Sequence, residues 1–360
     1  MRTIVKVHTP EERLSMRLTG ERRTTQCLIR LVAVTSMLRT LLTRVLPLAG
    51  SAGWWLSVCC FLPGVAVYAL LTLSMRLTKT VVLSDTMRAA CGPFGAWLLA
   101  GLLAALLLMD GVSSMTALVT LFTEGIGAQG TQFTLALLTG AVLLFCLHKE
   151  GLSRGAFFLR WLMLAALAVI ALDWLSMAHL DGFFPMLGDG VPSLMAAFRA
   201  GMSLAWPLAL LLTEKPVRPG VRIRPVVPVL LLGFGVVLLT CLSLPHELLV
   251  THHSLSGSML EMTLHLHPAV RMLAICLILL VLFLTLGGTA HLLTGYVMAP
   301  TACDPAWLPY AAVAVLVLSQ LTDTRTLWSL LGRVEPWLLV PVAALAIVSL
   351  AVAMLRRRRA

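Results

Sequence analysis

Asp110 is the residue whose position in the sequence most directly suggests chemistry. It lies in LLMDGVSSMTALVT, a stretch with no other charge, and Ser113, Ala117 and Thr120 follow it at helical spacing. A carboxylate is costly to place inside a bilayer, so one found there is a candidate functional group. The small, polar stripe suits a helix that lines a cavity, where Asp110 would bind a substrate ammonium, a cation or a proton. The alternative is a protonated or paired aspartate that only joins helices.

The stretch TTQCLIRLVAVTSMLRTLLTRVLP is unusual because it combines high apolarity with Arg30, Arg39 and Arg44, and has Thr35 and Ser36 between them. Three arginines would not face lipid. Either this helix is enclosed by its neighbours, or its backbone is interrupted near the two hydroxyls, with peptide groups available to a ligand. Snorkelling to the two interfaces would explain Arg30 and Arg44 better than Arg39. Arg30 and Arg39, together with Arg199 farther along the chain, are the possible partners of Asp110.

Motifs of catalysis and of metal binding are absent from the sequence. It contains no GxSxG, no HExxH and no phosphate loop, and its eight cysteines form no CxxC pair, so we expect neither an enzyme nor a bound cofactor or metal. Five of the nine histidines fall within one short segment: His246, His252, His253, His265 and His267. No cysteine accompanies them, and we interpret the segment as an interfacial outer loop.

The elements that must position these residues are transmembrane helices. Of the 360 residues 59% are hydrophobic and only 12% are charged, whereas a soluble domain carries about a quarter charged residues. A spanning helix needs roughly 20 mostly apolar residues. The sequence predicts an all-α polytopic membrane protein with ten spans, at 26–48, 54–75, 94–122, 132–147, 155–175, 193–213, 225–245, 268–296, 305–322 and 336–355. In the long eighth span, Gly287 and Gly288 mark either a break or a close approach to a neighbouring helix.

The net charge of +11 follows from topology. With a cytoplasmic N-terminus, the inner segments hold 19 of the 27 Lys and Arg residues and the outer segments hold two. The positive-inside rule therefore places both termini in the cytoplasm. We expect a cytoplasmic tail over residues 1–25, one transmembrane domain over 26–355 and a basic cytoplasmic end over 356–360. No nucleic-acid partner is expected, because the basic residues are dispersed among loops; they face the anionic inner leaflet of the bilayer.

The sixth predicted span contains a glycine and a proline six residues apart, Gly201 and Pro207, with Ser203 between them. This spacing is typical of a discontinuous helix. Spans one and six are corresponding members of two five-helix halves, and interruptions at corresponding positions indicate a midplane site in transporters built from inverted repeats. The repeat is inferred from the count of spans.

Three stretches, together with the length and the ten-helix plan, resemble a known family. They are AGSAGWWLSV (residues 49–58), HKEGLSRGAFFLRW (148–161) and DGFFPMLGDGVPSLMAAFRAG (181–201). Over about residues 22–355 the chain is similar to the B subunit of spore germinant receptors. This is the spore germination permease family within the amino acid/polyamine/organocation transporter superfamily.

The resemblance implies a LeuT-like fold with a 5+5 inverted repeat. Helices one and six would be interrupted around a small-molecule site that helices three and eight wall. It also implies a nutrient sensor, for amino acids for example, in the spore inner membrane, in complex with a second membrane subunit and a lipoprotein. The predicted ligand-binding residues are Thr35, Ser36, Asp110, Ser113, Gly201 and Ser203, of which Ser113 follows from the polar stripe alone. The chain departs from the family in having no glycine between Thr24 and Ala49 and no carboxylate in the sixth span.

A second function fits the same residues. A proton- or ion-coupled amino-acid permease would use the same cavity, with Asp110 taking up the proton. A membrane-embedded enzyme acting on lipid or cell-wall precursors would need a polar catalytic cluster at an interface, and the sequence offers none.

Overall fold

The computed structural model describes residues 10–125, 130–148, 151–176, 178–179, 184–213, 226–244, 249, 266–293, 307–322 and 324–359. Within these ranges every regular element is a helix and no strand is present. Seven of the helical segments there are long and apolar enough to cross a membrane, and two shorter apolar helices accompany them. The chain is thus an all-α membrane protein, as predicted; the ten crossings stay a prediction.

The described helices have the following order along the chain. They are α1 (Pro10–Thr40), η1 (Leu41–Val45), α2 (Leu46–Ala49), η2 (Gly50–Ala52), α3 (Gly53–Leu77), α4 (Leu83–Thr120), η3 (Leu121–Gly125), α5 (Gln132–His148), α6 (Gly151–Ser176), α7 (Val191–Gly201), η5 (Met202–Leu204), α8 (Ala205–Leu210), η6 (Leu211–Thr213), α9 (Val226–Ser243), α12 (Pro268–Leu292), α13 (Leu308–Leu318), η9 (Ser319–Leu321) and α14 (Thr324–Arg359). Of these, η1 and η3 are π-helices, and η2, η5, η6 and η9 are 3-10 helices.

Each of the ten predicted spans is helical where the structure describes it, except for the end residues Leu244, Trp307 and Thr322, and two helices are longer than expected. Helix α1 begins at Pro10, so residues 10–25, expected as part of a tail, continue the first helix. Helix α14 begins at Thr324, so Arg325, Arg333 and Glu335, expected in an outer loop, are helical. The apolar segments long enough to cross a membrane still begin near the predicted residues, at Thr24 and Arg333, because charged residues end the apolar stretch without ending the helix.

Two glycines divide long apolar stretches at the predicted positions. Gly50 has φ 52° and separates α2 from the turn that leads into α3. Gly92 has φ 76°, and Pro93 follows it, so α4 is bent there, two residues before the predicted third span begins. A positive φ is strained for residues with a Cβ, which explains why glycine occupies both positions.

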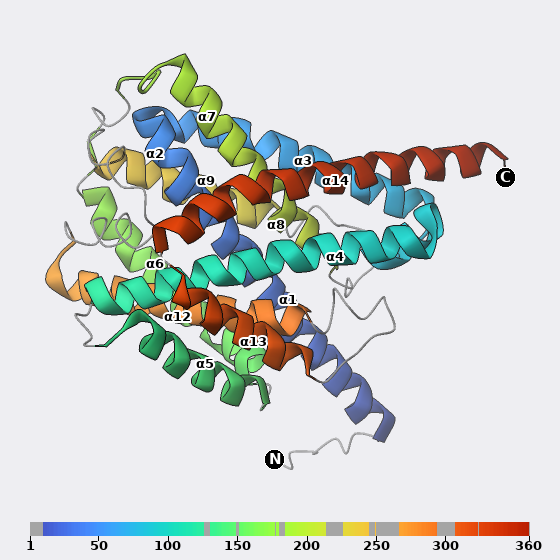
Figure 1. The fold of residues 1–360 in the computed structure, drawn as a ribbon, viewed down its shortest axis with the longest axis horizontal. Helices are drawn as coiled ribbons and strands as arrows, with labels where there is room; N and C mark the ends of the chain where they lie inside the picture. Colours follow the sequence, from blue (N-terminus) through green and yellow to red (C-terminus); the bar gives the residue numbers. More distant parts are fainter. Residues whose placement is uncertain are drawn as a thin grey trace, which may run out of the picture.

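Helices α1 and α4 are the central elements of the packing. Helix α4 runs across the molecule between α14 on one side and α12 and α13 on the other (Figure 1). Helix α1 packs against α6, α8, α9 and α12. Of the seven long apolar segments, the one from Val191 to Thr213 has the largest buried share and the one from Arg154 to Ser176 the smallest. The first, third and sixth predicted spans thus form the interior, while α6 faces outward.

The described part of the eighth predicted span, residues 268–293, is a continuous helix that packs closely on its neighbours. A Cβ at Gly288 would lie 2.6 Å from Val32 Cγ2 of α1, and one at Gly287 would collide with the Leu152 side chain of α6. The two glycines therefore permit a close approach, and α12 shows no break there.

Candidate functional site

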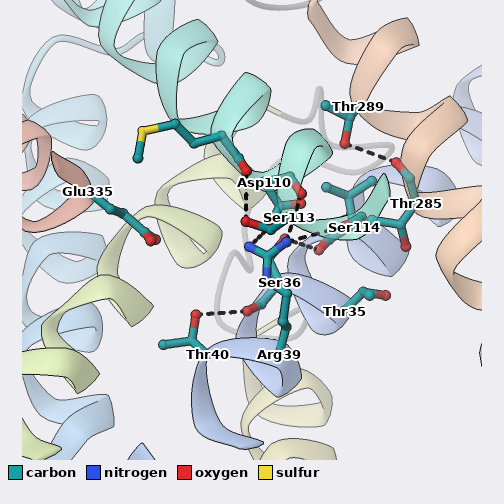
Figure 2. A network of polar contacts seen from close by, with 12 residues as sticks. Thr35, Ser36, Arg39, Thr40, Asp110, Ser113, Ser114, Thr285, Thr289 and Glu335 are labelled. Carbon is teal, nitrogen blue, oxygen red and sulfur yellow. Dashed lines mark hydrogen bonds and ion pairs between the residues drawn. The ribbon is translucent and has the colours of Figure 1, made fainter. Parts of the chain in front are cut away.

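Arg39 and Asp110 form a buried ion pair between α1 and α4. The side chains are 5% and 0% exposed, respectively. The Nη2 of Arg39 donates to Asp110 Oδ1, and its Nη1 donates to the Asp110 backbone oxygen at 2.7 Å and to Ser114 Oγ at 3.2 Å. Figure 2 shows the guanidinium pointing from α1 onto the polar face of α4. Of the three arginines considered as partners of Asp110, the structure selects Arg39.

The second carboxylate oxygen of Asp110 is unused. Asp110 Oδ2 is buried and has no hydrogen-bond partner among the described residues. Ser36 lies beside the Asp110 carboxylate, and the negative charge of Glu335 on α14 acts on the same carboxylate. An unpartnered carboxylate oxygen in a dry interior is costly, and an ammonium, a hydroxyl or a proton would satisfy it.

The three predicted hydroxyl residues near the ion pair are all buried and all bond back to their own helix. Thr35 donates to Leu31 O at 2.9 Å, Ser36 to Val32 O at 2.8 Å and Ser113 to Met109 O at 2.9 Å. Each oxygen still has acceptor capacity, because a hydroxyl has two lone pairs. These groups can receive a donor from a ligand without giving up their present bonds.

The predicted stripe on α4 lies in a part of the helix that is buried on all sides, from Asp110 to Thr120. Asp110, Ser113, Ala117 and Thr120 are all buried. Farther along the same helix, Thr116 Oγ1 accepts a hydrogen bond from the Nε2 of Gln320 on η9 at 3.1 Å.

Threonines of α12 extend the polar interior on the side of α4 away from Glu335. Thr285 and Thr289 are fully buried, and the Thr289 hydroxyl donates to Thr285 O at 3.0 Å (Figure 2). The first, third and eighth predicted spans therefore all contribute polar groups to one region.

Gly201 and Ser203 lie on the sixth predicted span, where it packs on α3. A Cβ at Gly201 would collide with the side chain of Cys60, so this glycine permits helix contact. Ser203 is fully buried in η5, which contacts α1, α3 and α14, and its hydroxyl has no partner among the described residues.

The backbone of the first and sixth spans is distorted but not unwound. Around Thr35 and Ser36 the chain is regular α-helix, so the first span is not interrupted there; Arg39 is enclosed by neighbouring helices, whereas Arg30 is exposed. The π-helix η1 follows one turn later. In the sixth span the 3-10 turn η5 tightens the helix, and its residues keep right-handed helical dihedral angles. Backbone groups there are not freed for a ligand in the way that the family resemblance implies.

A second buried ion pair, which the sequence did not predict, joins Arg44 of η1 to Glu335 of α14. The Nη1 of Arg44 donates to Glu335 Oε2, and Trp206 Nε1 of α8 donates to Glu335 Oε1 at 3.1 Å. The carboxylate thus connects the first, sixth and tenth predicted spans. The available signal was its place beside Pro336 within an apolar run, LLGRVEPWLLV, where a solvated charge is unexpected.

Of the five clustered histidines, His267 alone is among the described residues, and the other four lie outside them. No group of three or more His, Cys, Asp or Glu side chains that could hold a metal ion occurs in the described part of the chain.

Comparison with known proteins gives no further identification. No family model matches the sequence, and no curated protein is significantly similar to it.

Proposed function

We propose that this chain is a membrane receptor subunit that binds a small zwitterionic nutrient, such as an amino acid, beside Arg39 and Asp110. The observation that carries the proposal is Asp110 Oδ2, a buried acceptor with no partner in the described part of the chain, next to an arginine and a cluster of hydroxyls. An ammonium placed at Oδ2 would make a charge-assisted hydrogen bond in a dry interior, where such bonds are strong.

The ion pair also suggests how binding would be signalled. An amino acid carries an ammonium and a carboxylate, which are the charges of Arg39 and Asp110 in reverse. Its carboxylate would compete for Arg39 while its ammonium binds Asp110. The direct contact between α1 and α4 would weaken, and the two helices would be free to shift. No covalent chemistry is required.

A ten-span, LeuT-like arrangement with an inverted repeat belongs to the same proposal. Two observations support it. The helical distortions η1 and η5 fall in the first and sixth predicted spans, and the buried polar side chains around the Arg39–Asp110 pair come from the first, third and eighth. In transporters with inverted repeats these are the elements around the midplane site. We further propose that both termini are cytoplasmic and that the membrane is the spore inner membrane.

The receptor function predicts two partners, a second membrane subunit and a lipoprotein. Affinity purification of the chain from a spore-forming host should recover both. Deletion of the chain should abolish germination in response to at least one nutrient. Normal germination with every nutrient tried would reject the receptor function while leaving ligand binding at Asp110 intact.

A proton- or ion-coupled permease is the second candidate, and the same free oxygen favours it, because a proton can reside on Asp110 Oδ2. The two functions differ in transport. Purified protein in liposomes would accumulate labelled amino acid under an imposed proton gradient if it is a permease, and Asp110→Asn would abolish uptake. Saturable binding without uptake would reject the permease and support the receptor.

A further inference from the structure

Arg199 is an arginine inside an apolar span, and it has no acidic partner among the described residues. It was one of the three possible partners of Asp110, but the structure pairs that carboxylate with Arg39. Arg199 lies on α7, within the apolar segment Val191–Thr213, and its side chain is exposed. It takes part in none of the ion pairs or side-chain hydrogen bonds within the described residues. Charged side chains of transmembrane helices almost always face a bundle interior and have a partner, so this one is exceptional.

The position of Arg199 is well inside the outer half of the sixth predicted span. It follows the first residue of α7, Val191, by eight positions, or about 12 Å along the helix axis, and the hydrocarbon core is roughly 30 Å thick. Helix α7 begins at the predicted outer end, where the positive-inside rule disfavours a cation. Snorkelling to the outer headgroups would have to cover most of this distance. A partner within the membrane therefore satisfies the guanidinium better than a headgroup does.

The exposed face of α7 is apolar apart from this charge. Val191 and Met195 precede Arg199 at intervals of four residues, and Met202 follows it after three, so all four lie on one side of the helix. Val191, Met195 and Met202 are 65%, 53% and 44% exposed, respectively. Methionine side chains adapt their shape to a binding partner. Helix α7 lies at the edge of the bundle, so this face is open to a further helix (Figure 1).

The turn before α7 adds exposed apolar side chains at the outer end of this face. Phe184 and Met186 are 61% and 54% exposed. Ser51 Oγ of η2 donates to Pro185 O at 2.6 Å, and Trp55 Nε1 of α3 donates to Met186 O at 2.9 Å. The turn is thus fixed to the bundle by side chains of two other elements. A surface that is already ordered loses little conformational entropy when a partner binds.

We propose that the Arg199 face of α7 (Val191, Met195, Arg199 and Met202) binds a transmembrane helix of another membrane protein, whose aspartate or glutamate pairs with Arg199. The planar guanidinium matches a carboxylate in a bidentate fork, and such a pair is strong in a dry surrounding. A second copy of this chain does not supply the carboxylate from the same face, because the face carries none. The proposal rests on the place of Arg199 in a membrane span and not on the function proposed for Asp110.

The test is photo-crosslinking in the membranes of the native host, with a photoreactive residue in place of Met195 in the full-length chain. We expect an adduct with another membrane protein, and the crosslinked peptide should come from a transmembrane segment that contains an aspartate or a glutamate. The same substitution at Leu172, which is 67% exposed on α6, is the matched control and should not give this adduct. Arg199→Gln should lower the yield of the adduct about tenfold, as for loss of one charged hydrogen bond. Arg357→Gln, which removes an exposed arginine of α14, should leave the yield unchanged.

Two further measurements separate loss of binding from loss of folding. The purified Arg199→Gln chain should unfold at the same midpoint as the wild type, because the isolated chain has no partner for Arg199. If it unfolds earlier, Arg199→Lys replaces it; this variant keeps the charge without the fork and should lower the yield partially. Arg199→Asp should abolish the adduct, and exchange of the partner's carboxylate for arginine should restore it. Lipid or a second copy of the chain as the only adduct at Met195, a crosslinked segment without a carboxylate, or an undiminished yield in the Arg199 variants would overturn the proposal.

Discussion

The guanidinium of Arg39 and the carboxylate of Asp110 form a buried ion pair in which the arginine uses two nitrogens and the aspartate only one of its side-chain oxygens. The pair joins the first predicted span to the third at the centre of the polar interior. It contributes a direct helix contact and leaves one strong acceptor for a ligand. Four of the six predicted ligand-binding residues, Thr35, Ser36, Asp110 and Ser113, lie within this region (Figure 2).

Removing one member of the pair should destabilise the protein more than removing both. Arg39→Met leaves the Asp110 carboxylate buried without a counter-ion, and loss of one partner of a buried pair costs about 3–5 kcal/mol. The double variant Arg39→Met/Asp110→Leu leaves no buried charge, so we expect it to recover more than half of that loss. Equilibrium unfolding of the purified protein in detergent measures both. Additive losses in the double variant would show that the two side chains do not interact.

Glu335 should stabilise the fold by holding three predicted spans together. Glu335→Ala leaves the Arg44 guanidinium and the Trp206 indole N–H without their acceptor, so we expect a loss of about 3–5 kcal/mol. Glu335→Gln keeps an acceptor oxygen and should cost less. Thermal unfolding of both variants tests this order, with Asp85→Asn on the exposed face of α4 as the control. A stability of Glu335→Ala equal to that of the control would contradict the network.

Gly201 should tolerate no side chain. Gly201→Ala forces a Cβ against Cys60 of α3, and overpacking of this kind typically costs about 1–3 kcal/mol. Gly101 of α4 is the matched control, because a Cβ there meets nothing within 4 Å. Gly101→Ala should be neutral or stabilise the helix by up to about 1 kcal/mol. Unfolding midpoints that fall equally for the two variants would argue against close packing of α7 on α3.

The helices were largely predictable from the sequence, because the length of an apolar stretch and the position of a glycine are both local signals. Gly50 lies between the first two predicted spans, and Gly92, with Pro93 after it, bends α4 just before the predicted start of the third. The pairing of Asp110 with an arginine was also accessible, since a buried charge needs a partner. Which arginine it would be was not, because that depends on how α1 rotates against α4.

Glu335 was missed for a related reason. A carboxylate beside a proline at the edge of an apolar run is typical of the end of a loop. Only the distant partners of Glu335, Arg44 and Trp206, show that it is buried. The continuous helix around Thr35 is consistent with a departure from the family that was visible in the sequence. No glycine lies between Thr24 and Ala49, so no residue there favours an unwound turn.

The orientation of the chain gives a separate prediction. Because 19 of the 27 Lys and Arg residues fall in the predicted inner segments and two in the outer ones, both termini should be cytoplasmic. Fluorescent-protein fusions, which mature only in the cytoplasm, should fluoresce at either end. Alkaline phosphatase, which is active only outside, should be inactive at both. Opposite results for the two ends would require an odd number of crossings and exclude the ten-span arrangement.

The proposed binding function depends above all on Asp110 Oδ2 receiving the ammonium of a ligand. The direct measurement is a binding cycle that combines Asp110→Asn with removal of the ligand's amino group. Dissociation constants are determined for an amino acid that binds the wild type and for its deaminated analogue, on wild type and variant, with Glu335→Gln as the control. We predict that each single change weakens binding about 10- to 100-fold, as for loss of one charged hydrogen bond, and that both changes together weaken it little further. Fully multiplicative losses, or tight binding of the amino acid by Asp110→Asn, would contradict the assignment of Asp110 as the ammonium site.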